Sequence, residues 1–225
     1  MILYDLAGQD GRRFSPNCWR TRWALAHKGV AVETRAVCFT QIASLADGAQ
    51  KTVPVIDDGG HIIGDSWAIA RYLETHYPDR PSLFGGKEAE GLTAFVQSWA
   101  ITTLHAGIIP LILLDILNVL DSADRDYFRA SREKRFGQTL EELQAPRDEH
   151  LPDFRNSLQP LRMMLKQQRW IGGDAPLYAD YVCLAPFLWA RVVSDFPLLE
   201  KDDPVMEWFE RGLDLYDGLA RKAPC

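Results

Sequence analysis

The order of strand and helix patterns in the first 77 residues restricts this chain to few folds. Segments of apolar and β-branched residues predict four strands, at residues 2–7, 30–37, 53–57 and 61–63. A helix between the first two strands is predicted to begin at Ser15-Pro16, because serine caps a helix and proline fits its first turn. A second helix follows the last strand, from the cap at Asp65-Ser66 to Tyr77.

The connections between these segments indicate how the strands pair. A helix joins the first two strands, so a parallel pair with a right-handed crossover is expected. Asp58-Gly59-Gly60 lies between the last two strands and is typical of a hairpin turn, which predicts an antiparallel pair. A four-stranded sheet flanked by helices within residues 1–82 is the pattern of an α/β thioredoxin-like module.

Only helix patterns follow residues 78–86, whose two prolines and two glycines are typical of a linker. Apolar residues at helical spacing predict helices at residues 88–118, 124–143, 153–168, 178–193 and 204–219. We expect a bend in the first of them at Pro110 and a disturbance of the third at Pro160, because proline lacks a backbone donor. The chain is therefore predicted to hold two domains, an α/β thioredoxin-like domain at residues 1–82 and an all-α domain at residues 87–225.

The distribution of charge supports this division and excludes one class of partner. The chain has 25 Lys and Arg residues against 31 Asp and Glu residues, a formal charge of −6. Residues 1–82 carry equal numbers of acidic and basic residues, so the net negative charge falls on the later part. A nucleic-acid-binding protein normally shows a basic footprint, which this chain lacks. The neutral first domain suits a small anionic ligand better than the acidic second domain.

Other sequence features predict a cytoplasmic protein without a metal and without a membrane partner. The first five residues reach Asp5 without a basic region, unlike a secretory signal. The longest apolar run, residues 108–114, is far shorter than the ~20 residues of a membrane span. Four cysteines and five histidines are scattered, without the spacing of a disulfide framework or a metal site.

The tetrapeptide Ser15-Pro16-Asn17-Cys18 lies where the first strand leads into a helix. A helix N-terminus stabilises a thiolate, and thioredoxin-like folds keep their reactive group at this place. A redox pair would need cysteine at both ends, and Ser15 occupies the first of them. A serine hydroxyl can instead donate a hydrogen bond to a thiolate that another molecule supplies. The motif therefore favours use of an external thiol.

Two further motifs suggest where such a thiol compound would bind. Pro54 at the start of a strand cannot complete the hydrogen-bonded ladder, and a cis bond before it would expose the backbone of Val53 to a ligand. Asp65-Ser66 combines a carboxylate, a hydroxyl and free backbone N–H groups at a helix start. Asp65 can hold an ammonium group while Ser66 and the helix end hold a carboxylate, as an amino-acid head group requires.

These three sites, followed by a helical second half, resemble the cytosolic glutathione transferase family over essentially the whole chain. The resemblance implies glutathione as cosubstrate, bound by the first domain, and a cis bond at Val53-Pro54. It further implies that Ser15 stabilises the glutathione thiolate and that the backbone of Val53 pairs with the cysteinyl part. Asp65 and Ser66 would hold the γ-glutamyl group. The family resemblance also implies a homodimer.

Several residues near these motifs have two interpretations. Thr52 is a candidate neighbour of the glutathione site, whereas Phe39 and Gln41 either border it or lie in a surface loop. Ile101, His105 and Ile108 have the spacing of one helix face. That face suits a pocket for an apolar second substrate, but packing against the first domain predicts the same pattern.

A finer resemblance concerns residues 14–29, 64–69 and 131–141. These segments look like the bacterial β-etherases of lignin breakdown and their fungal etherase-like relatives, a subgroup with an active-site serine. Such an enzyme would attack a carbon that bears an aryloxy group and release a phenol. A general transferase would instead attack a halide, an epoxide or an activated alkene.

Two other functions remain open at this point. Cys18 is either a small buried residue or, if it faces the ligand, the nucleophile of a glutathione-dependent oxidoreductase or lyase. Asn17 either assists the thiolate or satisfies the first helical turn. The other alternative function is that of a glutathione-binding module without productive chemistry.

The remaining conspicuous residues are interpreted as structural. Trp19 and Trp23 lie four apart on one helix and are predicted to be core, and His105 is predicted to be a hydrogen-bonded structural histidine. The charge run at residues 132–135 is read as a solvated face without a site role. Asp180 keeps the acidic half of a helix-capping motif whose hydroxyl position is occupied by Leu177.

Overall fold

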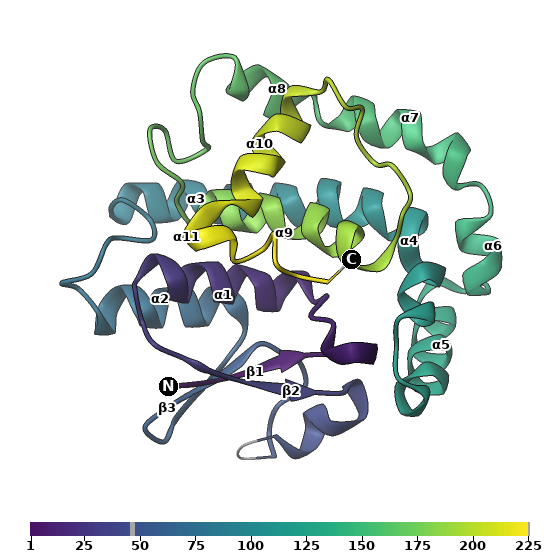
Figure 1. Ribbon diagram of the computed structural model, residues 1–225, viewed down its shortest axis with the longest axis horizontal. Helices are drawn as coiled ribbons and strands as arrows, with labels where there is room; N and C mark the ends of the chain where they lie inside the picture. The colour runs from purple at the N-terminus through teal and green to yellow at the C-terminus, as the bar shows by residue number, and fades with distance from the viewer. Residues whose placement is uncertain (46–47, 225) are drawn as a thin grey trace.

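The four predicted strands form one mixed sheet in the computed structural model, which describes residues 1–45 and 48–224 (Figure 1). The strand order is β2-β1-β3-β4, with β1 at Ile2–Leu6, β2 at Glu33–Val37, β3 at Val55–Asp58 and β4 at His61–Gly64. β1 pairs with β2 in parallel and with β3 antiparallel, and β3 pairs antiparallel with β4. The thioredoxin-like arrangement is confirmed. β3 begins after Pro54, because proline has no N–H for the ladder.

Two helices of the first half lie between this sheet and the rest of the molecule (Figure 1). They are α1 (Pro16–His27) and α2 (Ser66–His76), and α1 packs against α9 (Tyr178–Val193) of the second half. Trp19 and Trp23 on α1 are buried, which confirms their assignment to the core. The Trp23 ring stacks on Tyr181 of α9 with ring centroids 6.0 Å apart. The first helix therefore contributes to a core that extends into both halves.

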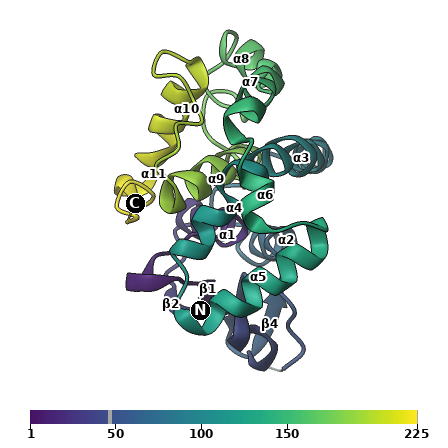
Figure 2. The ribbon, with the colours of Figure 1, turned by 90° about the vertical axis from the view of Figure 1, so that its right-hand side faces the viewer.

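Every regular element that the structure describes after residue 86 is a helix. They are α3 (Lys87–Trp99), η3 (Ala100–His105), α4 (Ala106–Asn118), α5 (Ser122–Phe136), α6 (Leu140–Gln144), α7 (Arg147–Ser157), α8 (Gln159–Leu165), α9, α10 (Pro204–Leu213) and α11 (Leu215–Gly218). In Figure 2, α5 extends from the helical half down beside the sheet. There it contacts the short helix η2 (Phe39–Ser44). The smaller turn η1 spans Gln9–Gly11.

Three predicted helices are divided in the structure. The prediction of one helix at residues 124–143 is wrong, because Gly137 ends α5 in the left-handed region at φ +73° and Thr139 caps α6. The stretch at residues 153–168 is split before α8, with Pro160 in the first turn of the new helix. The stretch at residues 204–219 is interrupted at Asp214, between α10 and α11.

The helical run from Lys87 to Asn118 departs from α geometry ahead of Pro110 rather than at it. Ala100–His105 forms a π-helical turn between α3 and α4. In a regular α-helix the ring of Pro110 would clash with the carbonyl group of Ala106, four residues earlier. Ala106 directly follows the π-helical turn. By length and composition alone the run could cross a membrane. Its buried apolar side chains, however, belong to the protein core.

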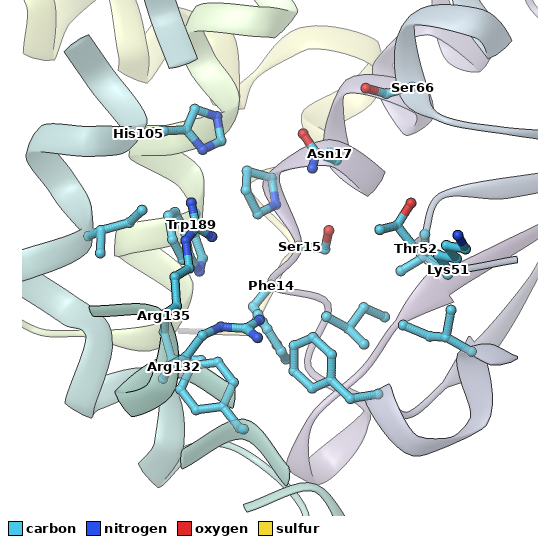
Figure 3. Close-up of a pocket in the computed structure, with 18 of the residues that line it drawn as sticks. Phe14, Ser15, Asn17, Lys51, Thr52, Ser66, His105, Arg132, Arg135 and Trp189 are labelled. Carbon is cyan, nitrogen blue, oxygen red and sulfur yellow. The ribbon is translucent and has the colours of Figure 1, made fainter. Parts of the chain in front are cut away.

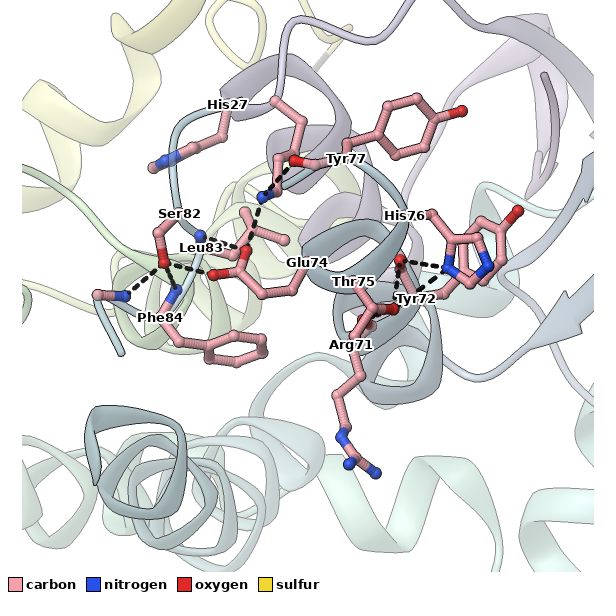
Figure 4. Close-up of polar contacts among 12 residues, drawn as sticks. His27, Arg71, Tyr72, Glu74, Thr75, His76, Tyr77, Ser82, Leu83 and Phe84 are labelled. Carbon is pink, nitrogen blue, oxygen red and sulfur yellow. Dashed lines mark hydrogen bonds and ion pairs between the residues drawn. The ribbon is translucent and has the colours of Figure 1, made fainter. Parts of the chain in front are cut away.

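The segment expected to be a linker is packed against both halves (Figure 4). Leu83 is fully buried, and its carbonyl oxygen accepts a hydrogen bond from the Tyr178 N–H at 2.8 Å. The Glu74 carboxylate accepts hydrogen bonds from the Leu83 N–H at 2.9 Å and from the Ser82 hydroxyl. Glu74 also forms an ion pair of 2.7 Å with Lys28, whose side chain is 1% exposed. Glu74 is therefore the counter-charge of a buried ammonium group at this junction.

Replacing Glu74 by glutamine should reduce the free energy of unfolding by about 2–4 kcal/mol, because Lys28 would remain buried without a counter-charge. Burial by itself raises the pKa of Glu74, but the Leu83 N–H, Lys28 and Ser82 outweigh it, so the pKa lies below its ordinary value near 4.5. The stabilisation is thus complete above that value and is lost as the pH falls through the pKa in the folded state. Urea unfolding at neutral and acidic pH should show that the free energies of unfolding of wild type and Glu74→Gln converge in acid.

The matched control for this experiment is Glu88→Gln, an exposed carboxylate on α3. It should change stability by less than about 0.5 kcal/mol. A gap between wild type and Glu74→Gln that stays constant into acid would contradict the role given to the Glu74 charge.

Candidate active site

A cleft of about 960 Å³ lies between the loops of the sheet and the helices of the second half (Figure 3). The first half contributes residues mainly from four places: the end of β1 with the loop that leads into α1, the helix η2, the segment before β3 and the start of α2. The second half contributes residues of α3, η3, α4, α5 and α9. The predicted site residues on this cleft are Ser15, Asn17, Thr52, Val53, Asp65 and Ser66. The fold thus brings together all three motifs found in the sequence.

Ser15 stands at the junction of the cleft and the first turn of α1. It caps this helix, and its Oγ accepts a hydrogen bond from the Cys18 N–H at 3.3 Å. A hydroxyl that accepts one hydrogen bond keeps its own proton to donate to a ligand. The N-terminus of α1 adds positive potential at the same place. The local geometry therefore suits a negatively charged sulfur atom beside Ser15.

The other two residues of this motif differ in their surroundings. Asn17 is exposed and lines the cleft. Cys18 is fully buried and does not line the cleft. Burial raises the pKa of the Cys18 thiol well above its ordinary value, and the nearby Asp5 carboxylate raises it further. A buried thiol that resists ionisation is a poor nucleophile.

The segment before β3 lines the cleft with Lys51, Thr52 and Val53. The Val53–Pro54 peptide bond is cis, and Val53 lines the cleft whereas Pro54 is buried beside it. The Pro54 carbonyl oxygen accepts a hydrogen bond from the Asp65 N–H at 3.2 Å. This bond connects the start of β3 to the start of α2.

The start of α2 is held in an unusual backbone conformation. Asp65 has a φ of +73°, a region that residues other than glycine seldom adopt and that is often found at functional sites. Its Oδ1 accepts hydrogen bonds from the N–H groups of Trp67 and Ala68, both at 3.0 Å. The buried Ser66 lies beside it, and the Ser66 carbonyl accepts a hydrogen bond from the buried Tyr178 hydroxyl at 2.8 Å. The helical half therefore fixes the position of this predicted binding site.

The structure separates the minor candidates. Thr52 and Phe39 line the cleft, but Gln41 does not. The Gln41 Oε1 accepts a hydrogen bond from the Cys38 N–H at 3.0 Å, within the turn that begins η2. Lys51 also lines the cleft, with an exposed side chain, although no local pattern in the sequence distinguished it.

His105 is a structural partner of an arginine that the sequence did not single out. Arg20, 3% exposed, donates a hydrogen bond from Nη2 to His105 Nε2 at 2.7 Å, and both residues line the cleft. Burial, together with the charge of Arg20, lowers the pKa of His105 to about 3. The ring is therefore neutral, with Nε2 as the acceptor. Along the same helical run, Ile101 and Ile109 line the cleft, whereas Ile108 is buried away from it.

The charge run on α5 is solvated only in part, because Lys134 and Arg135 are exposed whereas Arg132 and Glu133 are half-buried. The expectation that none of its residues borders a site is corrected. Arg132 and Arg135 both line the cleft, and Figure 3 shows the Arg132 side chain extended towards Phe14. The sequence pattern missed them because polar residues on an amphipathic helix look the same whether they face a cleft or bulk water.

The polar side chains of the cleft include hydroxyls, amides and cations, together with the Asp65 carboxylate and the His105 imidazole. Among residues 1–45 and 48–224, no group of three or more His, Cys, Asp or Glu side chains could hold a metal ion. The arrangement suits an organic ligand that carries carboxylates.

Both halves of the chain match descriptions of the same known protein family. Residues 11–81 match the family description "Glutathione S-transferase, N-terminal domain", and residues 91–208 match "Glutathione S-transferase, C-terminal domain". The chain belongs to the glutathione S-transferase family. The two matched regions correspond to the sheet-containing half and the helical half of the structure.

Two individual relatives resemble this chain over most of its length, and a third resembles a shorter part of it. A crystal structure of one from Ceriporiopsis subvermispora, in complex with glutathione, is 28% identical, with a TM-score of 0.78, and covers 99% of this chain and 94% of that one. The glutathione S-transferase-like protein ustS of Aspergillus flavus is 24% identical in an alignment of 218 positions that covers 84% of this chain and 78% of the relative. A maleylacetoacetate isomerase of Dictyostelium discoideum is 37% identical in a shorter alignment of 75 positions that covers 28% of this chain and 32% of the relative.

Proposed function

We propose that this glutathione S-transferase activates the glutathione thiol through Ser15 Oγ and directs the thiolate at an aromatic electrophile. One observation carries the proposal: Ser15, Val53 and the Asp65-Ser66 helix start line a single cleft. The opposite side of that cleft is lined by aromatic and aliphatic side chains of the helical half. A peptide thiol and an apolar partner would therefore meet at Ser15.

Each part of glutathione has a matching group in the cleft. The Ser66 hydroxyl and the N-terminus of α2 suit the γ-glutamyl carboxylate, and the second oxygen of Asp65 suits the ammonium group. The backbone of Val53 suits the cysteinyl amide. The exposed ammonium of Lys51 suits the glycyl carboxylate at the other end of the tripeptide.

The chemical step needs a thiolate at neutral pH. A free thiol of this type has a pKa near ~8.5. A hydrogen bond from Ser15 Oγ, together with the positive end of α1, stabilises the anion and lowers this pKa. The sulfur then attacks an electrophilic carbon, forms a C–S bond, and the leaving group departs with the bonding electron pair.

The resemblance to β-etherases supports one specific electrophile. In a β-aryl ether, the thiolate would attack the carbon that bears the aryloxy group, and the departing phenolate would take a proton from solvent. A halogenated aromatic would instead lose halide from the ring carbon that the sulfur attacks.

The alternative with Cys18 as nucleophile is not favoured by the geometry. Its thiol is fully buried, lies outside the cleft and has a raised pKa. A glutathione-binding module without catalysis would have the same glutathione site, so it is an outcome of the experiment below.

The proposal is tested by calorimetric titration with glutathione, followed by the ultraviolet absorbance of the bound thiolate across pH. We expect binding, and a thiol pKa below that of free glutathione. Turnover is then compared between a β-aryl ether compound and a halogenated aromatic. No binding at millimolar glutathione would overturn the proposal, and binding without turnover of either electrophile would favour the non-catalytic module.

We also propose that the protein is a homodimer. Leu92 and Phe95 on α3 are 71% and 74% exposed and three residues apart, so they form an apolar strip on the surface. Burial of this strip against a second copy would remove it from water. Sedimentation equilibrium that gives the monomer mass at micromolar concentration would contradict this.

A further inference from the structure

We propose that the second substrate is an aromatic electrophile that carries an anionic group, a carboxylate in the simplest case, and that Arg132 holds this group with the help of Arg135. The proposal rests on the proposed function, which it deepens by naming the substrate class. It is carried by the position, the partners and the surroundings of these two arginines.

The two arginines are the cations of α5 that face the cleft. They lie three residues apart, which places them on the same side of the helix. Both line the cleft, whereas Arg129, one turn before them, does not. In Figure 3 they lie on the opposite side of the cleft from Lys51, Thr52 and Ser66. They are therefore remote from the groups that suit the two carboxylates of glutathione.

Their charges are not neutralised by the protein that the structure describes. Arg129 is bound by Glu133 at 2.9 Å and by Glu141 at 2.8 Å. In contrast, neither Arg132 nor Arg135 forms an ion pair with any residue of 1–45 or 48–224. Arg132 Nη1 donates a hydrogen bond to a neutral group, the Ser131 hydroxyl, at 2.9 Å.

Arg132 is also partly withdrawn from water. Its guanidinium lies over the rings of Phe128 and Phe39, 4.7 and 5.4 Å from their centroids. Burial lowers the pKa of Arg132, and the neighbouring charge of Arg135 adds to this effect. A cation that has lost part of its hydration gains more from an anionic partner than one in bulk water. Apart from the N–H group donated to Ser131, the N–H groups of Arg132 remain available for hydrogen bonds to a carboxylate.

The surroundings specify that the anion is aromatic. Phe39 lies in contact with three other aromatic rings of the cleft, and the centroid distances are 6.2 Å to Phe14, 6.2 Å to Tyr127 and 5.7 Å to Phe128. A planar ring packs well on such a wall. Ser15 adjoins this wall directly after Phe14, so a ring placed there would bring its electrophilic carbon towards the thiolate.

The net negative charge of the protein makes a local cationic site important for binding an anion. At a formal charge of −6 the protein repels anions on average. Two unpaired arginines beside the aromatic wall reverse that effect at one place. A neutral aromatic substrate would need neither of them.

The experiment compares a chlorodinitrobenzoate with its methyl ester in wild type, Arg132→Gln, Arg132→Lys and the control Arg129→Gln. In both compounds the glutathione sulfur bonds to the ring carbon and chloride leaves, so only the carboxylate differs. Each rate is divided by the uncatalysed rate, which removes the difference in intrinsic reactivity. We expect Arg132→Gln to lose about 10- to 100-fold in kcat/KM for the carboxylate, and less than about threefold for the ester.

Arg132→Lys should retain part of the preference because it keeps the charge but loses the paired geometry. Arg129→Gln should retain all of it, and thermal unfolding checks that each variant is folded. Equal losses for both compounds, or a rise in the KM for glutathione with Arg132→Gln, would overturn the inference while leaving the transferase activity intact. Absence of glutathione binding and of ester turnover in wild type would instead remove the proposed function itself.

Discussion

Replacing Ser15 by alanine should lower kcat for conjugation by about 100- to 1,000-fold, the usual effect of removing one hydrogen-bond donor from a developing or stabilised anion. The Ser15 hydroxyl caps α1 and adjoins the place where the sulfur would lie. Its loss removes a donor to the thiolate and should raise the pKa of the bound thiol. Thiolate absorbance against pH and steady-state kinetics measure the two effects separately.

The control for Ser15 must account for its role as a helix cap. Loss of the cap is expected to cost about 1 kcal/mol of stability, which thermal unfolding detects. Ser15→Thr keeps the hydroxyl and the cap, and it should retain more activity than Ser15→Ala. Cys18→Ala leaves Ser15 in place, and a folded variant should retain conjugation. Activity that persists in Ser15→Ala and disappears in a folded Cys18→Ala protein would replace our proposal by the Cys18 mechanism.

Asp180→Ala should reduce the free energy of unfolding by about 4–6 kcal/mol, because it leaves four N–H groups around a buried carboxylate position without their acceptor. The Asp180 carboxylate is fully buried and accepts hydrogen bonds from the N–H groups of Ile171, Gly172 and Leu177 at 2.7, 2.9 and 3.0 Å. It also accepts one from Trp208 Nε1 at 3.3 Å. A typical domain is stable by about 5–15 kcal/mol, so this loss approaches the total. Denaturant unfolding at neutral pH gives the value.

Two variants make the test of Asp180 specific. Asp180→Asn keeps one acceptor oxygen and should destabilise less than alanine does. Asp174→Ala removes an exposed carboxylate from the same loop and should change stability by less than about 0.5 kcal/mol. A loss for Asp180→Ala no larger than that for Asp174→Ala would contradict the role assigned to the buried carboxylate.

The comparison of sequence and structure at Asp180 shows what a local motif can convey. The sequence identified the capping aspartate and the missing hydroxyl at Leu177. It did not reveal that Asp180 also binds the loop at Ile171 and Gly172 and the indole of Trp208 on another helix. These partners lie between 8 and 28 residues away along the chain. A short capping pattern extends over three or four residues, so contacts at this range lie outside what it describes.

Some residues of the cleft could likewise be predicted from local sequence, whereas others could not. Ser15, Val53 and Asp65-Ser66 were found because each lies at the end of a strand or the start of a helix, where the residue type itself reports the backbone geometry. Gln41 was predicted from its position after a strand, but its side chain completes a local turn instead of reaching the cleft. Lys51 was missed because an exposed lysine has no distinctive sequence context.

The order of the four strands and the two helices of the first half, with the caps at Ser15 and Asp65, could be predicted from the sequence, and so could the helical nature of the second half. These features depend on the chain's conformation within a few residues, and the side chains there report it directly. Which polar residues of the helical half face the cleft, in contrast, depends on the packing of elements far apart in the chain. Arg20 meets His105 from 85 residues away, and Arg132 joins Phe39 of the other half. Which side of a helix faces another element depends on how whole elements pack, because helical periodicity distinguishes apolar from polar faces but not a cleft from water.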